Sequence, residues 1–217
     1  MDEQLLARVI VVAIMLLVGF PVHEFAHALA AYRLGDSTAR FMGRLTLNPI
    51  AHFDPLGGIL LAVTFILSSF GFGWAKPTPV NPSNLEGGRN GEAIVAAAGP
   101  ISNLVLAIAA ALPLRYLIAN PQLADQIPLI VLEVLFYFVY INLVLMVFNL
   151  FPIPPLDGSK VLFAVLPPQV SWRWRPVLEQ YGFIVLLLVF FVPPGNSIGG
   201  RIIGPILDGL FTLLVGG

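Results

Sequence analysis

The chain has 217 residues, of which 58% are hydrophobic and only 11% are charged, whereas a soluble domain carries about a quarter charged residues. This composition predicts an integral membrane protein, and the formal net charge of -1 argues against nucleic acid as a partner. Because the chain contains no cysteine, disulfide bonds, thiolate metal sites and a cysteine nucleophile are all excluded.

The N-terminal segment predicts one long helix over residues 5–34, apolar in its first half. We expect it to be retained as a membrane span, since it has no small-residue cleavage site. His23, Glu24 and His27 form an H-E-x-x-H motif within it. Residues four apart share one face of a helix, so both imidazoles can bind one metal ion while Glu24 flanks it. Ionisable residues inside a span are costly, which favours a functional site.

The next stretch is less regular. Residues 40–48 alternate loosely and precede many turn-forming residues, which predicts a short β-hairpin or strand followed by a loop. The apolar segment Ile59–Phe72 falls short of the roughly 20 residues that a full span needs. We therefore interpret it as a re-entrant or surface-lying piece. Residues 74–90 contain many prolines and glycines and predict a loop.

The remainder predicts two full spans, a proline-rich break and shorter helical pieces. Small residues at the start of the first of these spans should let another helix approach closely. The expected elements are spans over 93–117 and 129–150, the break FPIPPLDGSK over 151–160, a short helix over 161–166, a polar loop over 167–176, and apolar segments over 181–192 and 202–215.

These elements predict an all-α polytopic membrane protein, a bundle of five to six hydrophobic helical segments. We expect a single membrane-embedded domain over residues 1–217. Its catalytic core would span about 4–166, with C-terminal helical segments over about 178–216.

A catalytic zinc ion takes three protein ligands and keeps one position open. The chain has three histidines, so the third ligand must be His52 or a carboxylate. The candidate carboxylates include Asp54, Glu133, Asp157 and Glu179.

The orientation follows if Asp157 is that ligand, because the end of the 129–150 span must then lie at the same membrane face as the end of the first helix. With residues 59–72 not crossing, eight basic residues lie at that face and three at the other, which predicts that the active site is near the cytoplasmic face. The eight are Arg33, Arg40, Arg44, Lys76, Arg89, Lys160, Arg173 and Arg175, and the three are Arg8, Arg115 and Arg201.

Three ordered motifs resemble the site-2 proteases, intramembrane zinc metalloproteases that cut transmembrane helices of regulatory proteins. They are HEFAH at His23–His27, AGPISN at Ala98–Asn103 and NLFPIPPLDG at Asn149–Gly158. The stretches LTLNPIAHFDPLGG and GWAKPTPVNP are also similar to the family, so the resemblance covers roughly residues 20–160. The chain is similar to the compact branch without PDZ or CBS domains.

The resemblance implies one Zn²⁺ per chain, held by His23, His27 and Asp157. It also implies that Glu24 is the general base for a zinc-activated water, and that Asn149 holds the substrate carbonyl or the oxyanion. Substrates would be single-span membrane proteins in the lipid bilayer, and homo-oligomers are left open. Two structural alternatives remain: Asp157 could cap the helix that follows it, and Asn149 could make an interhelical hydrogen bond.

A substrate helix must unwind before it is cut, and an edge strand could then hold it by strand addition. The candidate substrate-binding residues are Arg44, Leu45, Thr46, Leu47, His52 and Asn103. For His52 a turn-stabilising role is the alternative, and for Asn103 it is helix packing.

Two other functions compete with this interpretation. One is a metalloprotease of a different class, with Glu133 or Glu179 as the third ligand and a soluble substrate. The other is a zinc-binding membrane scaffold or transporter that uses Glu133, Asn142 and the histidines, although the sequence shows no repeated halves of the kind that transporters often have. The Trp172–Arg175 cluster is expected to be an interfacial anchor.

Overall fold

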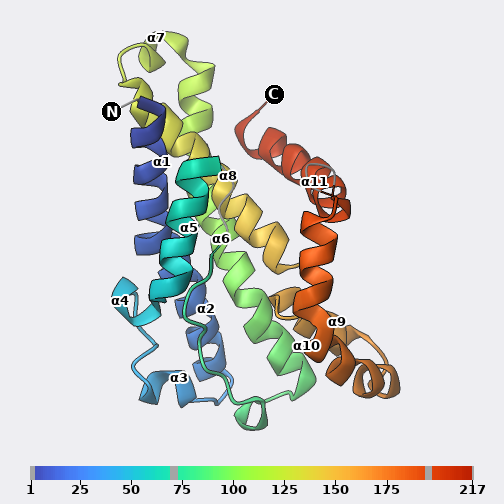
Figure 1. The fold of residues 1–217 in the computed structure, drawn as a ribbon. Coiled ribbons are helices and arrows are strands. Elements are labelled where there is room, and N and C mark those ends of the chain that lie inside the picture. The colour runs from blue at the N-terminus through green and yellow to red at the C-terminus, as the bar shows by residue number, and fades with distance from the viewer. Residues whose placement is uncertain (1–2, 69–72, 194–196, 217) are drawn as a thin grey trace.

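The computed structural model describes residues 3–68, 73–193 and 197–216, and all the regular secondary structure in these ranges is helical (Figure 1). Five of the helices are long and apolar enough to cross a membrane. The predicted all-α polytopic architecture is therefore confirmed.

The first long helix is continuous but changes its winding. It runs as α1 (Glu3–Ile14), a π-helical turn η1 (Met15–Gly19) and α2 (Phe20–Arg33). A π-turn often lies next to a functional site, and here it directly precedes α2, which carries the two histidines. The helix ends where Gly35 adopts a φ of 97°, a left-handed conformation that favours glycine.

Asp36 fixes the end of this helix to a distant part of the chain. Its side chain is fully buried and accepts hydrogen bonds from Thr38, from the Asn81 backbone N–H at 2.7 Å and from the Asn84 amide at 3.1 Å. Burial raises the pKa of Asp36, but these hydrogen bonds outweigh it and hold the pKa below its usual range. The Glu86 N–H adds a bond to the Leu34 carbonyl at 2.8 Å.

The predicted β-hairpin near residues 40–48 is wrong. This region contains two short helices, α3 (Thr38–Phe41) and α4 (Pro49–His52), joined by turns. The buried Arg44 side chain donates to the Ala51 carbonyl, and the His52 ring bonds the Thr46 carbonyl at 2.8 Å. Side chains therefore satisfy the backbone groups that strand pairing would have used.

Helix α5 (Pro55–Ser68) contains most of the short apolar segment, and residues 69–72 lie outside the described part of the chain. Its apolar stretch, Pro55–Thr64, is shorter than a span. Residues 73–81 then run in an irregular segment without helix, followed by the 3₁₀ turn η2 (Pro82–Asn84). We call residues 73–81 the strap. It confirms that the proline-rich stretch is a loop.

Helices α6 (Arg89–Ala119) and α8 (Leu129–Asn149), connected through α7 (Pro121–Ala124), form the centre of the bundle. Alanines 107, 110 and 111 of α6 are buried against Val139 and Leu143 of α8. These small residues allow the two backbones to approach closely.

The C-terminal part consists of α9 (Asp157–Val165), α10 (Pro168–Phe191) and α11 (Ile198–Val215). The predicted polar loop over 167–176 is wrong, because α10 begins at Pro168. Proline is well tolerated in the first turn of a helix, and Arg175 pairs with Glu179 one turn later at 2.8 Å. Trp172 and Trp174 are exposed near the start of α10.

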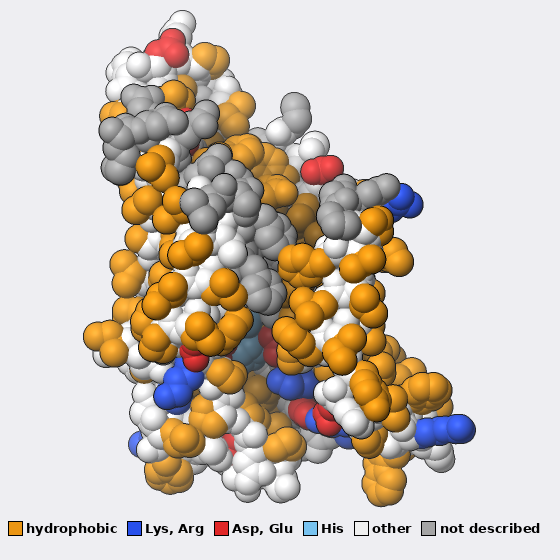
Figure 2. All heavy atoms as spheres, in the orientation of Figure 1, with side chains coloured by type: hydrophobic (Ala, Val, Ile, Leu, Met, Phe, Trp, Pro, Cys, Tyr) orange, Lys and Arg blue, Asp and Glu red, His pale blue; other side chains and the backbone are white. Residues whose placement is uncertain are grey.

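The helices form two columns in Figure 1, with α1, α2 and α5 on the left and α10 and α11 on the right. Helices α6 and α8 lie between them. Figure 2 shows hydrophobic side chains over the middle of both columns and most charged side chains below. A histidine side chain is visible in the hollow between the columns, just above these charges.

Candidate metal centre

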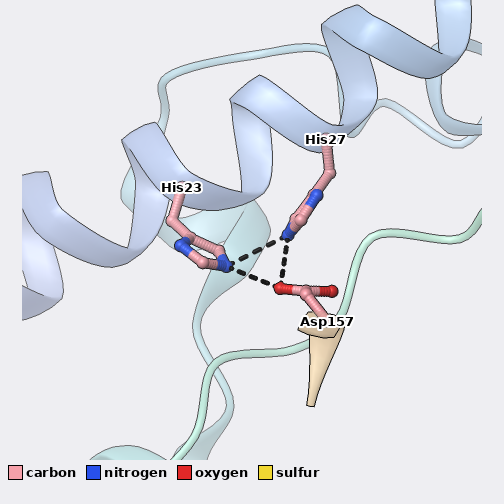
Figure 3. A group of neighbouring side chains, drawn as sticks. All are labelled: His23, His27 and Asp157. Carbon is pink, nitrogen blue, oxygen red and sulfur yellow. Dashed lines mark hydrogen bonds and ion pairs between the residues drawn. The ribbon is translucent and has the colours of Figure 1, made fainter. Parts of the chain in front are cut away.

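The structure brings His23, His27 and Asp157 together (Figure 3). The two imidazoles extend from consecutive turns of α2, and the carboxylate comes from the first residue of α9. All three are buried, although 130 positions separate His27 from Asp157 in the sequence.

The spacing of the three facing atoms suits a tetrahedral zinc ion. The Nε2 atoms of the two histidines are 3.0 Å apart, and they lie 3.3 and 3.2 Å from Oδ2 of Asp157. Bonds of about 2.0–2.1 Å in a tetrahedral site place neighbouring ligand atoms about 3.3–3.4 Å apart. The triangle therefore matches one face of a zinc coordination tetrahedron, and its fourth vertex remains for water or substrate.

The hydrogen bond that His27 makes outside this triangle determines which of its ring nitrogens can bind a metal ion. Its Nδ1 lies 2.7 Å from the Val95 carbonyl oxygen, which can only accept. Nδ1 must therefore carry the proton, and the neutral ring presents an unprotonated Nε2.

His23 is fixed in the same way by a chain of amides. The Phe138 carbonyl accepts from Asn142, the Asn142 oxygen accepts from Asn103 at 3.0 Å, and the Asn103 oxygen lies 2.5 Å from Nδ1 of His23. This series of hydrogen bonds ends on a backbone carbonyl, which can only accept. The amide of each asparagine therefore has one orientation, and Nδ1 of His23 must donate. Both asparagines are fully buried.

Three lone pairs therefore point at one another inside the protein. While both rings are neutral, their Nε2 atoms, 3.0 Å apart, have no proton to share, and a carboxylate oxygen adds negative charge. Such a group repels itself unless a proton or a metal cation lies between its members. The donor set, two imidazoles and a carboxylate, is one that zinc uses in catalytic sites.

Gly99 of α6 provides the room for this group. A Cβ atom added there would lie 2.6 Å from Nε2 of His23 and closer still to Nε2 of His27. The glycine in AGPISN is thus required by the metal centre itself, a role that sequence analysis assigned only to general helix packing.

Asp157 reaches the histidines because the proline-rich break ends beside α2. Leu156 is the N-cap residue of α9 and no side chain caps this helix, so the alternative capping role of Asp157 is not observed. Oδ1, which faces away from the histidines, lies 3.5 Å from the Lys160 ammonium.

Glu24 is held by the strap. The Thr78 backbone N–H donates to Oε2 of Glu24 at 2.7 Å, and the Thr78 hydroxyl donates to the Glu24 carbonyl at 2.9 Å. The carboxylate is half-buried and its Oε1 is not part of this clamp. Thr78 is a contact that no motif in the sequence indicated.

The other candidate ligands lie elsewhere. His52 is buried and bonded to the Thr46 carbonyl, which supports its turn-stabilising role. Asp54 accepts from the Gly57 N–H at 2.8 Å, Glu133 lines a separate cavity between α6 and α8, and Glu179 pairs with Arg175.

The remaining predicted residues are not part of the metal group. The Asn149 amide donates to the Leu145 carbonyl of its own helix at 2.9 Å. Arg44, Leu45, Thr46 and Leu47 lie in the turns between α3 and α4, so the edge strand proposed for them is absent from the described chain. Asn103 contacts His23, which is neither of the two roles that the sequence suggested.

Comparison with known protein families identifies the family of this chain. The model of peptidase family M50 matches residues 11–189. The chain belongs to this family, the site-2 proteases. Consistent with the sequence resemblance, it is a compact membrane zinc metalloprotease, and Zn²⁺ is the metal that the group of His23, His27 and Asp157 fits.

Curated relatives carry matching names. "Putative zinc metalloprotease YwhC" of Bacillus subtilis is 42% identical over 195 residues, which cover 85% of this chain and 82% of YwhC. "Putative zinc metalloprotease Rip2" of Mycobacterium tuberculosis H37Rv is 32% identical over 182 residues, and its Mycolicibacterium smegmatis counterpart is 30% identical over 175. The chain spans 66% and 64% of these two relatives. No solved structure matches the chain.

Replacing Gly99 with alanine should abolish stoichiometric zinc binding, because the added methyl group would displace both imidazole nitrogens. Zinc content of the purified protein, measured by mass spectrometry, tests this. Gly209→Ala is the matched control, since nothing lies within 4 Å of a Cβ at that helical position. Full zinc in the Gly99 variant would contradict the assigned role.

Asn103→Ala should weaken zinc binding by about 10- to 100-fold, the usual cost of losing the partner that orients a ligating imidazole. Competition with a chromophoric chelator measures this affinity. Asn120→Ala is the control, because its exposed amide bonds only its own helix. Equal affinity in the two variants would show that the amide chain does not orient His23.

Proposed function

We propose that this membrane metalloprotease cuts peptide bonds within or near the transmembrane segments of single-span membrane proteins. The observation that carries the proposal is the position of the metal group. His23 and His27 lie inside the candidate span Val9–Arg33, ten and six residues before its end, so the centre sits at the depth of a membrane helix near its boundary.

The active site would face the cytoplasm. Helices α2, α8 and α9 bring the metal group to the end of the bundle where α6 and α10 begin. Most basic residues lie at this end, and such an excess marks the cytoplasmic side. The same orientation leaves the short α5 on one side of the bilayer, in keeping with its length.

In the proposed reaction the metal group and Glu24 have separate roles. When bound, zinc would polarise the scissile carbonyl and acidify a water ligand. The Glu24 carboxylate takes a proton from the attacking water and passes it to the leaving amide nitrogen. The Thr78 N–H holds Oε2, so the carboxylate keeps one orientation and leaves Oε1 to exchange protons. Asn103 and Val95 keep both imidazoles in the ligating tautomer.

The hydrophobic surface of the two helix columns supports an approach of the substrate through the lipid. Figure 2 shows hydrophobic side chains on both sides of a histidine side chain. A substrate helix could therefore approach the metal group sideways, and it would have to unwind locally before its carbonyls became available. A single embedded domain with its catalytic core over residues 4–166 fits this route.

Glu24→Gln should retain zinc and the folded structure but lose cleavage of a model single-span substrate by at least about 100-fold, the lower range for general-base catalysis. Cleavage by purified, reconstituted protein is measured by mass spectrometry of the fragments. Glu86→Gln is the control, since Glu86 is exposed outside the metal group.

Cleavage at the wild-type rate by Glu24→Gln would overturn the proposed base. Whether the protein prefers membrane-embedded substrates is tested separately. The same substrate sequence is made soluble by deleting most of its transmembrane segment. Equal cleavage of the soluble form would show that membrane-embedded substrates are not preferred.

A further inference from the structure

A small cavity lies directly beside the metal centre. Its volume is about 150 Å³, well above the roughly 10–15 Å³ of such volume that one water needs, so it has room for several waters or one side chain. The strap, the start of α6 and α9 form its walls through Thr78, Val80, Pro82, Glu92, Val95 and Lys160.

Three of these wall residues also hold the catalytic groups. Thr78 binds Glu24, the Val95 carbonyl binds His27, and the Lys160 ammonium lies 3.5 Å from Asp157. A peptide bond placed at the metal group would therefore have a neighbouring residue within reach of the cavity.

Most of the cavity wall lies outside the candidate membrane spans. Thr78, Val80, Pro82 and Lys160 lie outside all the candidate spans, and Glu92 is in the first turn of α6. A substrate chain that passes from the lipid through the metal group would reach it with residues just outside the membrane.

The two charged side chains in the cavity wall differ in how free they are to bind a charged group of a substrate. Glu92 accepts two hydrogen bonds from Arg175, at 2.6 and 2.8 Å, so its charge is already compensated. Lys160 is 43% exposed and its ion pair is the long contact to Asp157. Once Asp157 binds a cation, its negative charge is shared with that ion, which leaves the Lys160 ammonium to bind another anion.

We propose that this cavity is a substrate subsite that takes an aspartate or glutamate side chain located beside the scissile bond and just outside the membrane, with Lys160 as the specificity-determining residue. The inference rests on the proposed function, because it assumes that membrane proteins are the substrates. An acidic residue is also costly within lipid, so it would naturally lie on this outer flank.

The test compares single-span substrates that carry Asp, Asn or Lys at successive positions on each side of the mapped cleavage site. Paired substrates compete in one reaction, and the ratio of their kcat/KM values is measured by mass spectrometry. The wild-type protein should favour the acidic substrate by about three- to fivefold at one position, the scale of a partly exposed ion pair. Lys160→Gln should bring this ratio to about one, and Lys160→Glu should reverse it.

Lys76→Glu is the matched control, because it makes the same charge change at an exposed strap residue that does not line the cavity. It should keep the wild-type preference. Zinc content is measured for every variant. If Lys160 merely positions Asp157, its variants will slow the cleavage of all substrates by the same factor and leave the kcat/KM ratios unchanged. That result would overturn the subsite. Cleavage without charge preference would also overturn it, whereas no cleavage of any substrate would overturn the proposed function as well.

Discussion

The structure depends on three possible metal-ligand atoms that face one another, which are Nε2 of His23, Nε2 of His27 and Oδ2 of Asp157. The Val95 carbonyl and the Asn103–Asn142 chain place a proton on Nδ1 of each histidine, so both Nε2 atoms meet Asp157 without a proton between them. A buried arrangement of this kind is stabilised when a cation lies at its centre, and the two imidazoles and the carboxylate suit a metal ion. Zinc binding is therefore expected to contribute to folding, because α2, α6 and α9 converge on a group that the ion must hold together.

Close helix approach makes this convergence possible. Gly99 brings α6 against the imidazole rings, and the alanines of α6 pack against α8, which carries Asn142. Gly158, next to Asp157, lies so close to the Leu150 carbonyl that a Cβ would collide with it. Small residues thus determine where the three side chains of the metal group lie, and the same glycines that weaken a helix by propensity are required by its neighbours.

The sequence was sufficient to predict the metal group but not its surroundings. The H-E-x-x-H spacing identified His23 and His27 as ligands, whereas Asp157 was singled out from the other candidates only by the resemblance to the site-2 proteases. Thr78 acts largely through its backbone N–H, and Asn103 and Asn142 are 39 residues apart, so neither contact follows from a local pattern. The hairpin prediction failed because Arg44 and His52 bond backbone carbonyls within their own loop. The start of α10 was missed because prolines that suggest a loop also suit the first turn of a helix.

The most direct measurement is an X-ray absorption spectrum at the zinc edge of the purified wild-type protein, with Asp157→Ala beside it. The account predicts a four-coordinate ion with two imidazoles and oxygen ligands at about 2.0–2.1 Å, and loss of stoichiometric zinc in the variant. Three imidazoles would instead make His52 a ligand. That result, or an unchanged spectrum and full zinc in Asp157→Ala, would contradict the arrangement on which the site, the orientation and the proposed peptidase activity all depend.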